Sequence, residues 1–410
     1  MAGRRAAARW LAVLLVGVIL VAPVQAKDKE KGGFSTGFVR WRSAENAFEG
    51  WARSGVKLGE GGTLQMDMQT ATPGSDPYPA GTYYGHNFYN GGSFCVGEAT
   101  SPEVSTGTAF TEAIASWNAD TPAGTWLETE LRAYVGDHWT KWYNMGVWAS
   151  DSSTIERHSV NLQGDNDGYV AVDTLVLSDK APAATKLQLK VRLFSADGSA
   201  TPTLRNASVA FSTAAEKPKA LEPAGDVRDV VLGVPECSQM VYPDGGNVWC
   251  SPTSTSMVLG FWGQSGDSCS DRVHAAVAGV YDWLYDGHGN WPFNTAYAAT
   301  YGLEAYVARF SSLRQLEPWI AAGVPVVMSD AWKKNELTGA PVKSSSGHLV
   351  VLAGFDANGN PVVNDPAAAT DDEVQRTYDR TEFETIWLEH SAGTVYLIYP
   401  PTVKAPQLPQ

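Results

Sequence analysis

The sequence is short of charge, and of positive charge in particular. Asp, Glu, Lys and Arg make up only 18% of the 410 residues, and 30 basic side chains stand against 44 acidic ones, for a formal net charge of −14. Recognition of nucleic acid or of an anionic membrane surface depends on clustered Lys and Arg. The composition therefore argues against either as the main partner.

Long apolar runs are absent apart from one at residues 10–21, which follows three arginines within the first nine residues. This run is shorter than the ~20 apolar residues that span a bilayer. Val24-Gln25-Ala26 then fits the small-x-small pattern that precedes signal-peptide cleavage. We expect a signal peptide over residues 1–26, cleaved near Ala26, and a secreted protein with no membrane contact afterwards. The Arg4-Arg5 pair leaves Sec and twin-arginine export as alternatives.

Cysteine is scarce, with four residues, Cys95, Cys237, Cys250 and Cys269. An exported protein enters an oxidising compartment, in which disulfides persist. If all four cysteines paired, no free thiol would remain for chemistry, and if Cys250 is reactive, an odd number is left over. We prefer a Cys237–Cys269 bond with Cys95 unpaired and buried, although the sequence leaves the connectivity open.

Patterns that bind metals are missing as well. The seven histidines show no spacing typical of a zinc site. The turn Asp165-Asn166-Asp167-Gly168 has oxygen ligands but lacks the remaining positions of a calcium loop. We therefore predict no metal and no other cofactor.

The residues that are present fall into two regions of different pattern. From about residue 34 to 212, short segments of alternating apolar and polar residues are separated by Gly, Pro, Asn and Asp, most clearly at Trp126–Tyr134 and Lys186–Leu193. Alternation of this kind is typical of strands with one buried and one solvated face. We expect an all-β sandwich domain over residues 34–212.

The second region follows a linker that we expect over residues 213–227, and it combines helical and strand-like segments. Helices are predicted at Ser251–Phe261, Asp271–Leu284 and Leu313–Ala322, and strands at His348–Leu352, Val362–Val363 and Thr394–Ile398. Helices followed by antiparallel strands indicate an α+β domain. We place this domain over residues 228–399, before a loose tail at residues 400–410.

The sharpest local pattern begins at Cys250. Pro252 is favoured in the first turn of a helix, so Cys250 is expected at a helix N-terminus. The unsatisfied N–H groups and the positive end of the helix dipole stabilise an anion there, and a thiolate is the reactive form of cysteine. Without a partner base, a structural cysteine would be the simpler interpretation of Cys250.

A base and an orienting carboxylate are available downstream. His348 follows a Ser- and Gly-rich loop and opens an apolar strand, where a side chain is held rigidly and can face a cleft, although a histidine without a role at a strand edge is the alternative. The chain returns after the Asn358-Gly359 turn signal to Asp365. A strict two-residue turn would pair Asp365 with Leu352, so contact with His348 requires a longer turn or a bulge near Asp356.

These blocks together resemble a known family. Val234-Pro235 with Gln239, Trp249-Cys250 with Pro252-Thr253-Ser254, Gly347-His348-Leu349 and Asn364-Asp365-Pro366 are similar, in the same order, to the peptidase domain that trims double-glycine leaders from bacteriocins. The match spans about residues 228–399. The closer likeness is to secreted, stand-alone relatives in actinobacteria that carry an N-terminal β-domain. Ser251 stands where the family has a glycine after the cysteine.

The resemblance implies a papain-like fold with thiol catalysis. Cys250 would be the nucleophile, His348 the base, Asp365 the residue that orients the histidine, and Gln239 a donor to the oxyanion, together with the Cys250 backbone N–H. We predict a secreted cysteine peptidase that hydrolyses amide bonds in peptide or protein substrates through a thioester. A transglutaminase-like acyltransferase is the alternative among enzymes.

Two further groups of residues bear on ligands. Trp249, Asn290 and Trp291 are expected to line the substrate groove, the last two within a glycine-containing loop at Gly287–Asn294. The N-terminal region is also rich in aromatics that could stack on cell-wall glycans, namely Tyr83, Tyr84, Phe88, Tyr89, Trp117, Trp126, Trp139, Trp142, Tyr143 and Trp148. A core role for these rings is the preferred interpretation. A secreted glycan-binding protein with an inactive papain-like domain is the alternative from a different class.

Overall fold

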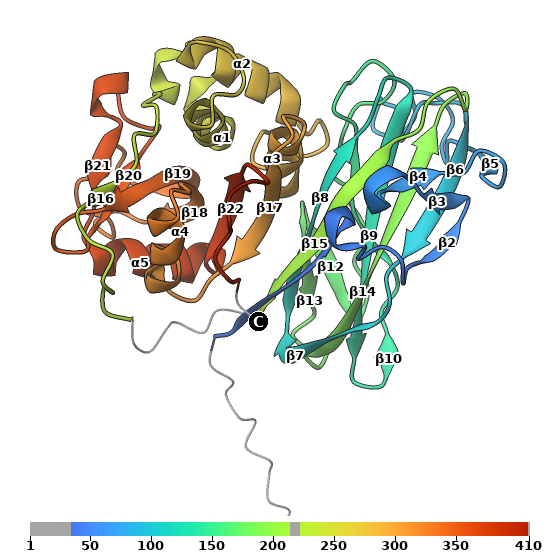
Figure 1. Ribbon diagram of the computed structural model, residues 1–410, viewed down its shortest axis with the longest axis horizontal. Coiled ribbons are helices and arrows are strands. Elements are labelled where there is room, and N and C mark those ends of the chain that lie inside the picture. Colours follow the sequence, from blue (N-terminus) through green and yellow to red (C-terminus); the bar gives the residue numbers. More distant parts are fainter. Residues whose placement is uncertain (1–33, 214–221, 409–410) are drawn as a thin grey trace, which may run out of the picture. The chain divides into compact units, whose positions relative to one another are not determined.

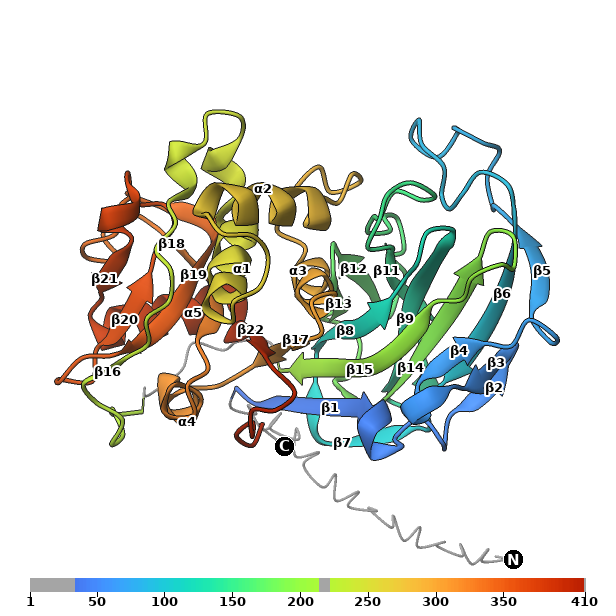
Figure 2. The ribbon, with the colours of Figure 1, turned by 45° about the horizontal axis from the view of Figure 1, so that its top comes forward.

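Two antiparallel sheets make up the N-terminal part of the chain (Figures 1 and 2). The computed structural model describes residues 34–213 and 222–408, so the expected signal peptide and most of the expected linker lie outside the described residues. The strands of this part are β1 (Thr36–Arg42), β2 (Ala52–Ser54), β3 (Val56–Leu58), β4 (Leu64–Met66), β5 (Thr72–Ser75), β6 (Ser93–Thr100), β7 (Val104–Phe110), β8 (Glu112–Asp120), β9 (Thr125–Val135), β10 (His138–Trp139), β11 (Tyr143–Trp148), β12 (Gly168–Ala171), β13 (Thr174–Leu177), β14 (Ala184–Ser195) and β15 (Thr203–Ser212).

The two sheets share one apolar core. One sheet has the order β12-β13-β8-β15-β4-β3, with β1 on β15, and the other has β10-β9-β14-β6-β2, with β5, β7 and β11 attached at β6, β14 and β9. Buried side chains from β8 and β15 form one cluster with those from β9 and β14, including Ala115, Val209, Leu127 and Leu189. Interleaving of two inner faces is the packing of a β-sandwich.

The outer face of the second sheet is covered, which the alternating pattern did not predict. Glu128 in β9 is buried, accepts hydrogen bonds from the Tyr89 hydroxyl and from Arg192, and lies beneath an aromatic cluster that includes Phe94 and Trp126. Seven of the ten aromatics considered above are buried: Tyr83, Phe88, Tyr89, Trp117, Trp126, Tyr143 and Trp148. Most of these rings therefore pack inside the domain, in agreement with the preferred interpretation.

The C-terminal part places helices beside a third antiparallel sheet. Its elements are β16 (Val230–Val231), α1 (Cys250–Phe261), α2 (Cys269–Val280), α3 (Trp291–Ala299), β17 (Glu304–Arg309), α4 (Glu317–Ala321), β18 (Val326–Trp332), β19 (Ser345–Phe355), β20 (Pro361–Asn364), β21 (Gln375–Thr377), α5 (Arg380–Ser391) and β22 (Thr394–Tyr399). The sheet order is β17-β22-β18-β19-β20-β21, with β16 on β19. No helix in the described ranges is long and apolar enough to cross a membrane.

Helix boundaries differ from the prediction where capping decides them. The segment at Gly287–Asn294, expected to be a loop, is half helix, because the Asn290 side chain accepts the Phe293 N–H at 3.2 Å and Pro292 fits the first turn of α3. The helix expected at Leu313–Ala322 is split into a 3₁₀ turn and α4. Pro318 has no N–H to donate and is tolerated only in a first turn, so a new helix begins there.

The described residues form one compact unit in which β8 lies against β17. The Val307 N–H donates to the Ser116 hydroxyl at 3.0 Å, and the Ala305 N–H donates to Asn118 at 3.3 Å. Arg309 at the end of β17 pairs with Glu112 at 2.6 Å. Side chains of the first sheet thus bind the backbone of the third sheet's edge strand, which protects that edge.

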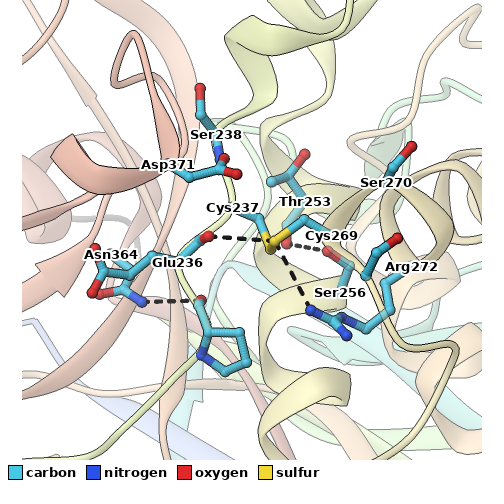
Figure 3. The surroundings of a disulfide bond; sticks show 12 residues. Glu236, Cys237, Ser238, Thr253, Ser256, Cys269, Ser270, Arg272, Asn364 and Asp371 are labelled. Atoms are coloured by element: carbon cyan, nitrogen blue, oxygen red, sulfur yellow. Dashed lines mark hydrogen bonds between the residues drawn. A yellow bond between two sulfur atoms is a disulfide. The ribbon is translucent and has the colours of Figure 1, made fainter.

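A disulfide joins Cys237 to Cys269, which confirms the preferred pairing (Figure 3). Cys95 and Cys250 are free, and Cys95 is half-buried in β6 rather than fully buried as expected. The bond ties the segment before Gln239 to the first residue of α2. It therefore restrains a part of the chain that has no strand or α-helix of its own between β16 and α1.

Removing this disulfide should lower the free energy of unfolding by about 3–4 kcal/mol. The two cysteines are 32 residues apart, and closing a loop of that length restricts the unfolded chain by about this much. The measurement is chemical denaturation of the Cys237→Ser, Cys269→Ser double variant beside the wild type. Cys95→Ser, which breaks no bond, is the control and should change the value far less. Equal stability of the wild type and the double variant would contradict the prediction.

Candidate active site

Cys250 is the first residue of α1, as the position of Pro252 predicts. Its thiol is half-buried, and the first N–H groups of a helix have no partners within the helix. The Ser254 hydroxyl, one turn further on, donates to the Leu349 carbonyl of β19 at 3.0 Å. This bond holds the start of α1 against the strand that carries His348.

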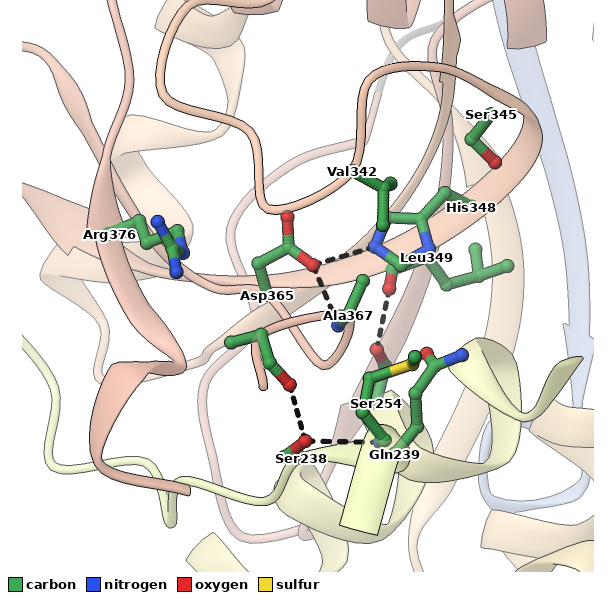
Figure 4. A network of polar contacts seen from close by, with 12 residues as sticks. Ser238, Gln239, Ser254, Val342, Ser345, His348, Leu349, Asp365, Ala367 and Arg376 are labelled. Atoms are coloured by element: carbon green, nitrogen blue, oxygen red, sulfur yellow. Dashed lines mark hydrogen bonds and ion pairs between the residues drawn. The ribbon is translucent and has the colours of Figure 1, made fainter. Parts of the chain in front are cut away.

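His348 lies between a carboxylate and the thiol (Figure 4 shows the carboxylate side). Its Nε2 is 2.8 Å from Oδ1 of Asp365, and the two side chains are 5% and 0% exposed. Burial lowers the pKa of His348, but Asp365 and a hydrogen bond and charge interaction with Cys250 outweigh it and raise that pKa well above its usual value. Because Nε2 is engaged with Asp365, Nδ1 is the ring nitrogen left for Cys250.

Asp365 is held by two further donors besides the imidazole. The Ala367 N–H donates to its Oδ1 at 2.9 Å, and the Tyr378 hydroxyl donates to its Oδ2 at 2.7 Å. Burial alone would raise the pKa of Asp365, but His348, Tyr378 and Ala367 lower it below the usual value. The carboxylate is therefore ionised and fixed in orientation. Tyr378 comes after β21 in a segment without a recognisable motif, so no sequence signal pointed to it.

The register of β19 and β20 brings Asp365 to His348 by the bulge that the sequence analysis required. Val351 pairs with Asn364 and Leu352 with Val363, but the register then shifts by one residue between Leu352 and Gly354. The turn is also longer than two residues, since the Asp356 N–H donates to the Asn360 carbonyl at 2.9 Å. The bulge and the longer turn each shift β20 along β19, so that Asp365 moves from a position opposite Leu352 toward His348.

A second carboxyl, Asp330 of β18, lies directly opposite His348 of β19 in the strand register. Directly opposite residues of an antiparallel pair point to the same face. Asp330 is 1% exposed, and neither of its oxygens has a hydrogen-bond partner among the residues that the structure describes. Burial raises the pKa of Asp330 to about 8, against the lowering effect of His348 and with a further raising effect of Asp365. At neutral pH Asp330 is mostly protonated, so the ionised partner of the imidazole is Asp365.

Gln239 begins a 3₁₀ turn (Gln239–Val241) beside the start of α1 and is buried. Its Nε2 donates to the Gly246 carbonyl at 2.8 Å, and its backbone N–H donates to the Pro366 carbonyl at 2.8 Å. An amide NH₂ has two N–H groups, so one remains for another acceptor. Ser238 positions this turn, since its hydroxyl accepts the Met240 N–H at 3.0 Å (Figure 4).

The proposed nucleophile and base open into a cleft of about 1210 Å³, whereas Asp365 lies behind its wall. Cys250, His348, Gln239 and Trp291 all contribute to its wall, as predicted, whereas Trp249 and Asn290 do not. Asn290 is fully buried, where it caps α3 and donates to Asp282 at 3.0 Å. Trp249 is buried against the rings of Tyr242, His274 and His288. The structure gives these two residues supporting positions instead of contact with a substrate. No cluster of His, Cys, Asp and Glu suited to a metal occurs among the described residues.

A nucleophilic thiol, an imidazole and an orienting carboxylate are the set through which cysteine hydrolases act. Comparison with known families agrees with that class. Residues 37–212 match the family described as the peptidase C39 N-terminal domain, and residues 231–395 match the peptidase C39-like family. The chain therefore carries a peptidase C39-like domain after a peptidase C39 N-terminal domain, which suggests a cysteine peptidase.

Other comparisons add little. No curated protein matches the chain. A Clostridium thermocellum endo-1,4-β-D-xylanase 10B structure, containing CBM22-1 and GH10 modules with xylohexaose, is similar over 47% of this chain and 30% of its own, with 11% identity and a TM-score of 0.18. The catalytic unit of a GH87 α-1,3-glucanase from Streptomyces thermodiastaticus strain HF3-3 is similar over 50% of this chain and 31% of its own, with 13% identity and a TM-score of 0.16. The chain thus spans about a third of each structure, and these values carry no argument about its fold or activity.

Proposed function

We propose that the protein is a secreted, papain-like cysteine peptidase that acts on peptide or protein substrates. The single observation that supports this most is the position of His348, engaged with Asp365 on one nitrogen and with Cys250 on the other side. A helix that begins at the cysteine and packs on an antiparallel sheet that carries the histidine fits an α+β papain-like domain. The predicted signal peptide and the Cys237–Cys269 bond are consistent with export.

In the proposed reaction, the Cys250 sulfur attacks the scissile carbonyl carbon and forms a tetrahedral oxyanion. The Cys250 backbone N–H and the remaining N–H of Gln239 donate to that oxyanion. Collapse breaks the C–N bond, and the His348 imidazolium gives its proton to the leaving amine. Water, deprotonated by His348, then hydrolyses the thioester and restores the thiolate–imidazolium pair.

Acyl transfer to an amine would use the same thioester, so product analysis separates it from hydrolysis. If an added amine captures most of the acyl group in competition with water, the transglutaminase-like alternative is favoured. A glycan-binding protein with an inactive cysteine domain has less support, because most of the aromatic rings that suggested it are buried in the sandwich.

Thiol labelling tests the proposed pairing directly. Cys95 is the internal reference, because it is the second free cysteine. We expect iodoacetamide to modify Cys250 at least about tenfold faster than Cys95 at pH 7, because a thiolate paired with imidazolium is the reactive species. Peptide mapping by mass spectrometry measures both rates in one sample. His348→Gln should slow Cys250 alone. If Cys250 reacts no faster than Cys95, or is found in a disulfide, the proposal fails.

A further inference from the structure

One wall of the cleft comes from the N-terminal domain, although the thiol and imidazole belong to the other domain. The hairpin of β12 and β13 presents Ala171, Val172, Thr174 and Val176 to the cleft that contains Cys250. The side chains of Ala171, Val172 and Val176 are exposed or half-buried. A substrate peptide bound at the thiol would therefore lie against this hairpin.

The tip of the hairpin is conformationally strained. Val172 has a φ of 59°, and the Asp173 N–H donates to the Ala171 carbonyl at 2.7 Å, which closes a three-residue turn around Val172. Positive φ is unfavourable for a β-branched residue, and turns of this kind normally use Gly, Asn or Asp. Such strain persists only where the surroundings impose it, and it concentrates at binding and catalytic sites.

Hydrogen bonds to the C-terminal domain hold the tip of the β12–β13 hairpin in place. Oδ2 of Asp173 accepts the Trp291 N–H at the start of α3 at 2.7 Å, and its Oδ1 accepts the Thr174 hydroxyl at 3.0 Å. Asp282, which supports the cleft loop through Asn290, accepts the Ser159 N–H of the N-terminal domain at 3.0 Å. The hairpin is thus fixed as a rigid part of the cleft.

Several of the side chains that line the cleft are apolar and exposed. Met240, Val248 and Tyr285 line the cleft and are 45%, 60% and 47% exposed. Among the charged lining residues, Glu112 is paired with Arg309, and Asp286 accepts the Tyr281 hydroxyl at 2.7 Å. The cleft therefore offers a ligand apolar surface from both domains beside exposed polar groups such as Asn247 and Ser346, and burial of the apolar part favours binding.

We propose that the Val172 turn is a specificity-determining element of the peptidase, which receives an apolar side chain of the substrate and favours peptides that carry one. This inference rests on the proposed function, and it assigns the N-terminal domain a role in substrate selection. In this proposal the Val172 methyl groups contact the substrate side chain, at a position where Gly or Asn would suit the backbone better.

The test compares kcat/KM for two peptide pools that differ only by Leu against Asn in the residues flanking the cleaved bond. Val172→Asn relieves the backbone strain and removes the methyl groups, so the Leu-over-Asn preference should fall about tenfold, while Tm stays equal or rises by about 1–2 °C. A merely structural valine would instead lower Tm on replacement. Val172→Ile should keep the preference.

Two controls keep the inference falsifiable. Tyr169→Asn alters an exposed residue of the same hairpin that does not line the cleft, and it should leave the preference unchanged. If Val172→Asn does not fold, Val176→Thr, an isosteric change on the same wall, should reduce the preference in the same direction. An unchanged preference in an active variant overturns this inference alone. A wild-type protein that cleaves no peptide and shows no fast labelling of Cys250 overturns the proposed function as well.

Discussion

Replacing Cys250 with alanine should abolish peptide hydrolysis and leave the fold intact. The substitution removes one half-buried sulfur at the first residue of α1, where alanine is a good helix former. Among the described residues that line the cleft, Cys250 is the only cysteine. We expect kcat/KM to fall by about 10⁴-fold or more, measured on a mixed peptide pool, with an unchanged Tm.

The matched control for this variant is Cys95→Ala. Both residues are free, half-buried cysteines, but Cys95 lies in β6, outside the cleft. We expect wild-type kcat/KM from Cys95→Ala. Hydrolysis that survives in Cys250→Ala and disappears in Cys95→Ala would show that the wrong thiol has been assigned.

Replacing Asp365 with asparagine should lower kcat by about 10²–10⁴-fold at neutral pH. An amide cannot stabilise the imidazolium by charge, and it can hold the ring in the wrong tautomer. Burial lowers the pKa of His348 whereas Asp365 raises it, so loss of the carboxylate lets the imidazolium lose its proton at lower pH. The alkaline limb of the kcat/KM profile should then move to lower pH by about 1–3 units.

The same pair predicts how stability depends on pH. A raised pKa at His348 contributes stability below its unfolded value of about 6.5, and this contribution is lost as the pH rises through the folded value. A lowered pKa at Asp365 contributes stability above about 3.9, lost as the pH falls through its folded value. Both contributions are fully present between these two unfolded values, so Asp365→Asn should lower the free energy of unfolding there and flatten the slopes on either side.

Asp330→Asn is the matched control for Asp365→Asn. Both carboxyls are buried beside His348, but with a pKa of about 8 Asp330 is already neutral near pH 6. The amide therefore replaces a neutral group, and kcat at pH 6 should change far less than in Asp365→Asn. If the two variants lose the same activity there, the orienting role assigned to Asp365 is wrong.

Local signals predicted the parts of the site that depend on local physics. Pro252 after Cys250 marks a helix start because its ring fits only the first turn, and α1 begins there. A two-residue turn at Asn358-Gly359 would place Asp365 opposite Leu352, four residues from His348. Contact between Asp365 and His348 therefore required a bulge or a longer turn, because regular pairing keeps the register constant. The position of the bulge, between Leu352 and Gly354, depends on packing against neighbouring strands and could not be derived.

Features that depend on distant segments were not accessible in this way. Tyr378 and Asp330 surround His348 only because β18, β19 and β20 lie side by side. The groove loop was expected to place Asn290 at the substrate, but a capping interaction and a bond to Asp282 withdraw it into the interior. The covered outer face of β9 likewise depends on a loop from elsewhere in the chain.

By itself, the sequence determined the division into a β-rich region and a helix-plus-strand region, the helix that starts at Cys250, and the order of the blocks that carry thiol, imidazole and carboxylate. These follow from periodicity, capping and turn chemistry, which act over a few residues. Only the tertiary structure decided that Asp365 is ionised while Asp330 is neutral, and that a hairpin of the first domain forms a wall of the cleft. The protonation states depend on burial and on all the charged groups nearby. The cleft wall depends on pairing between segments that are far apart in the sequence.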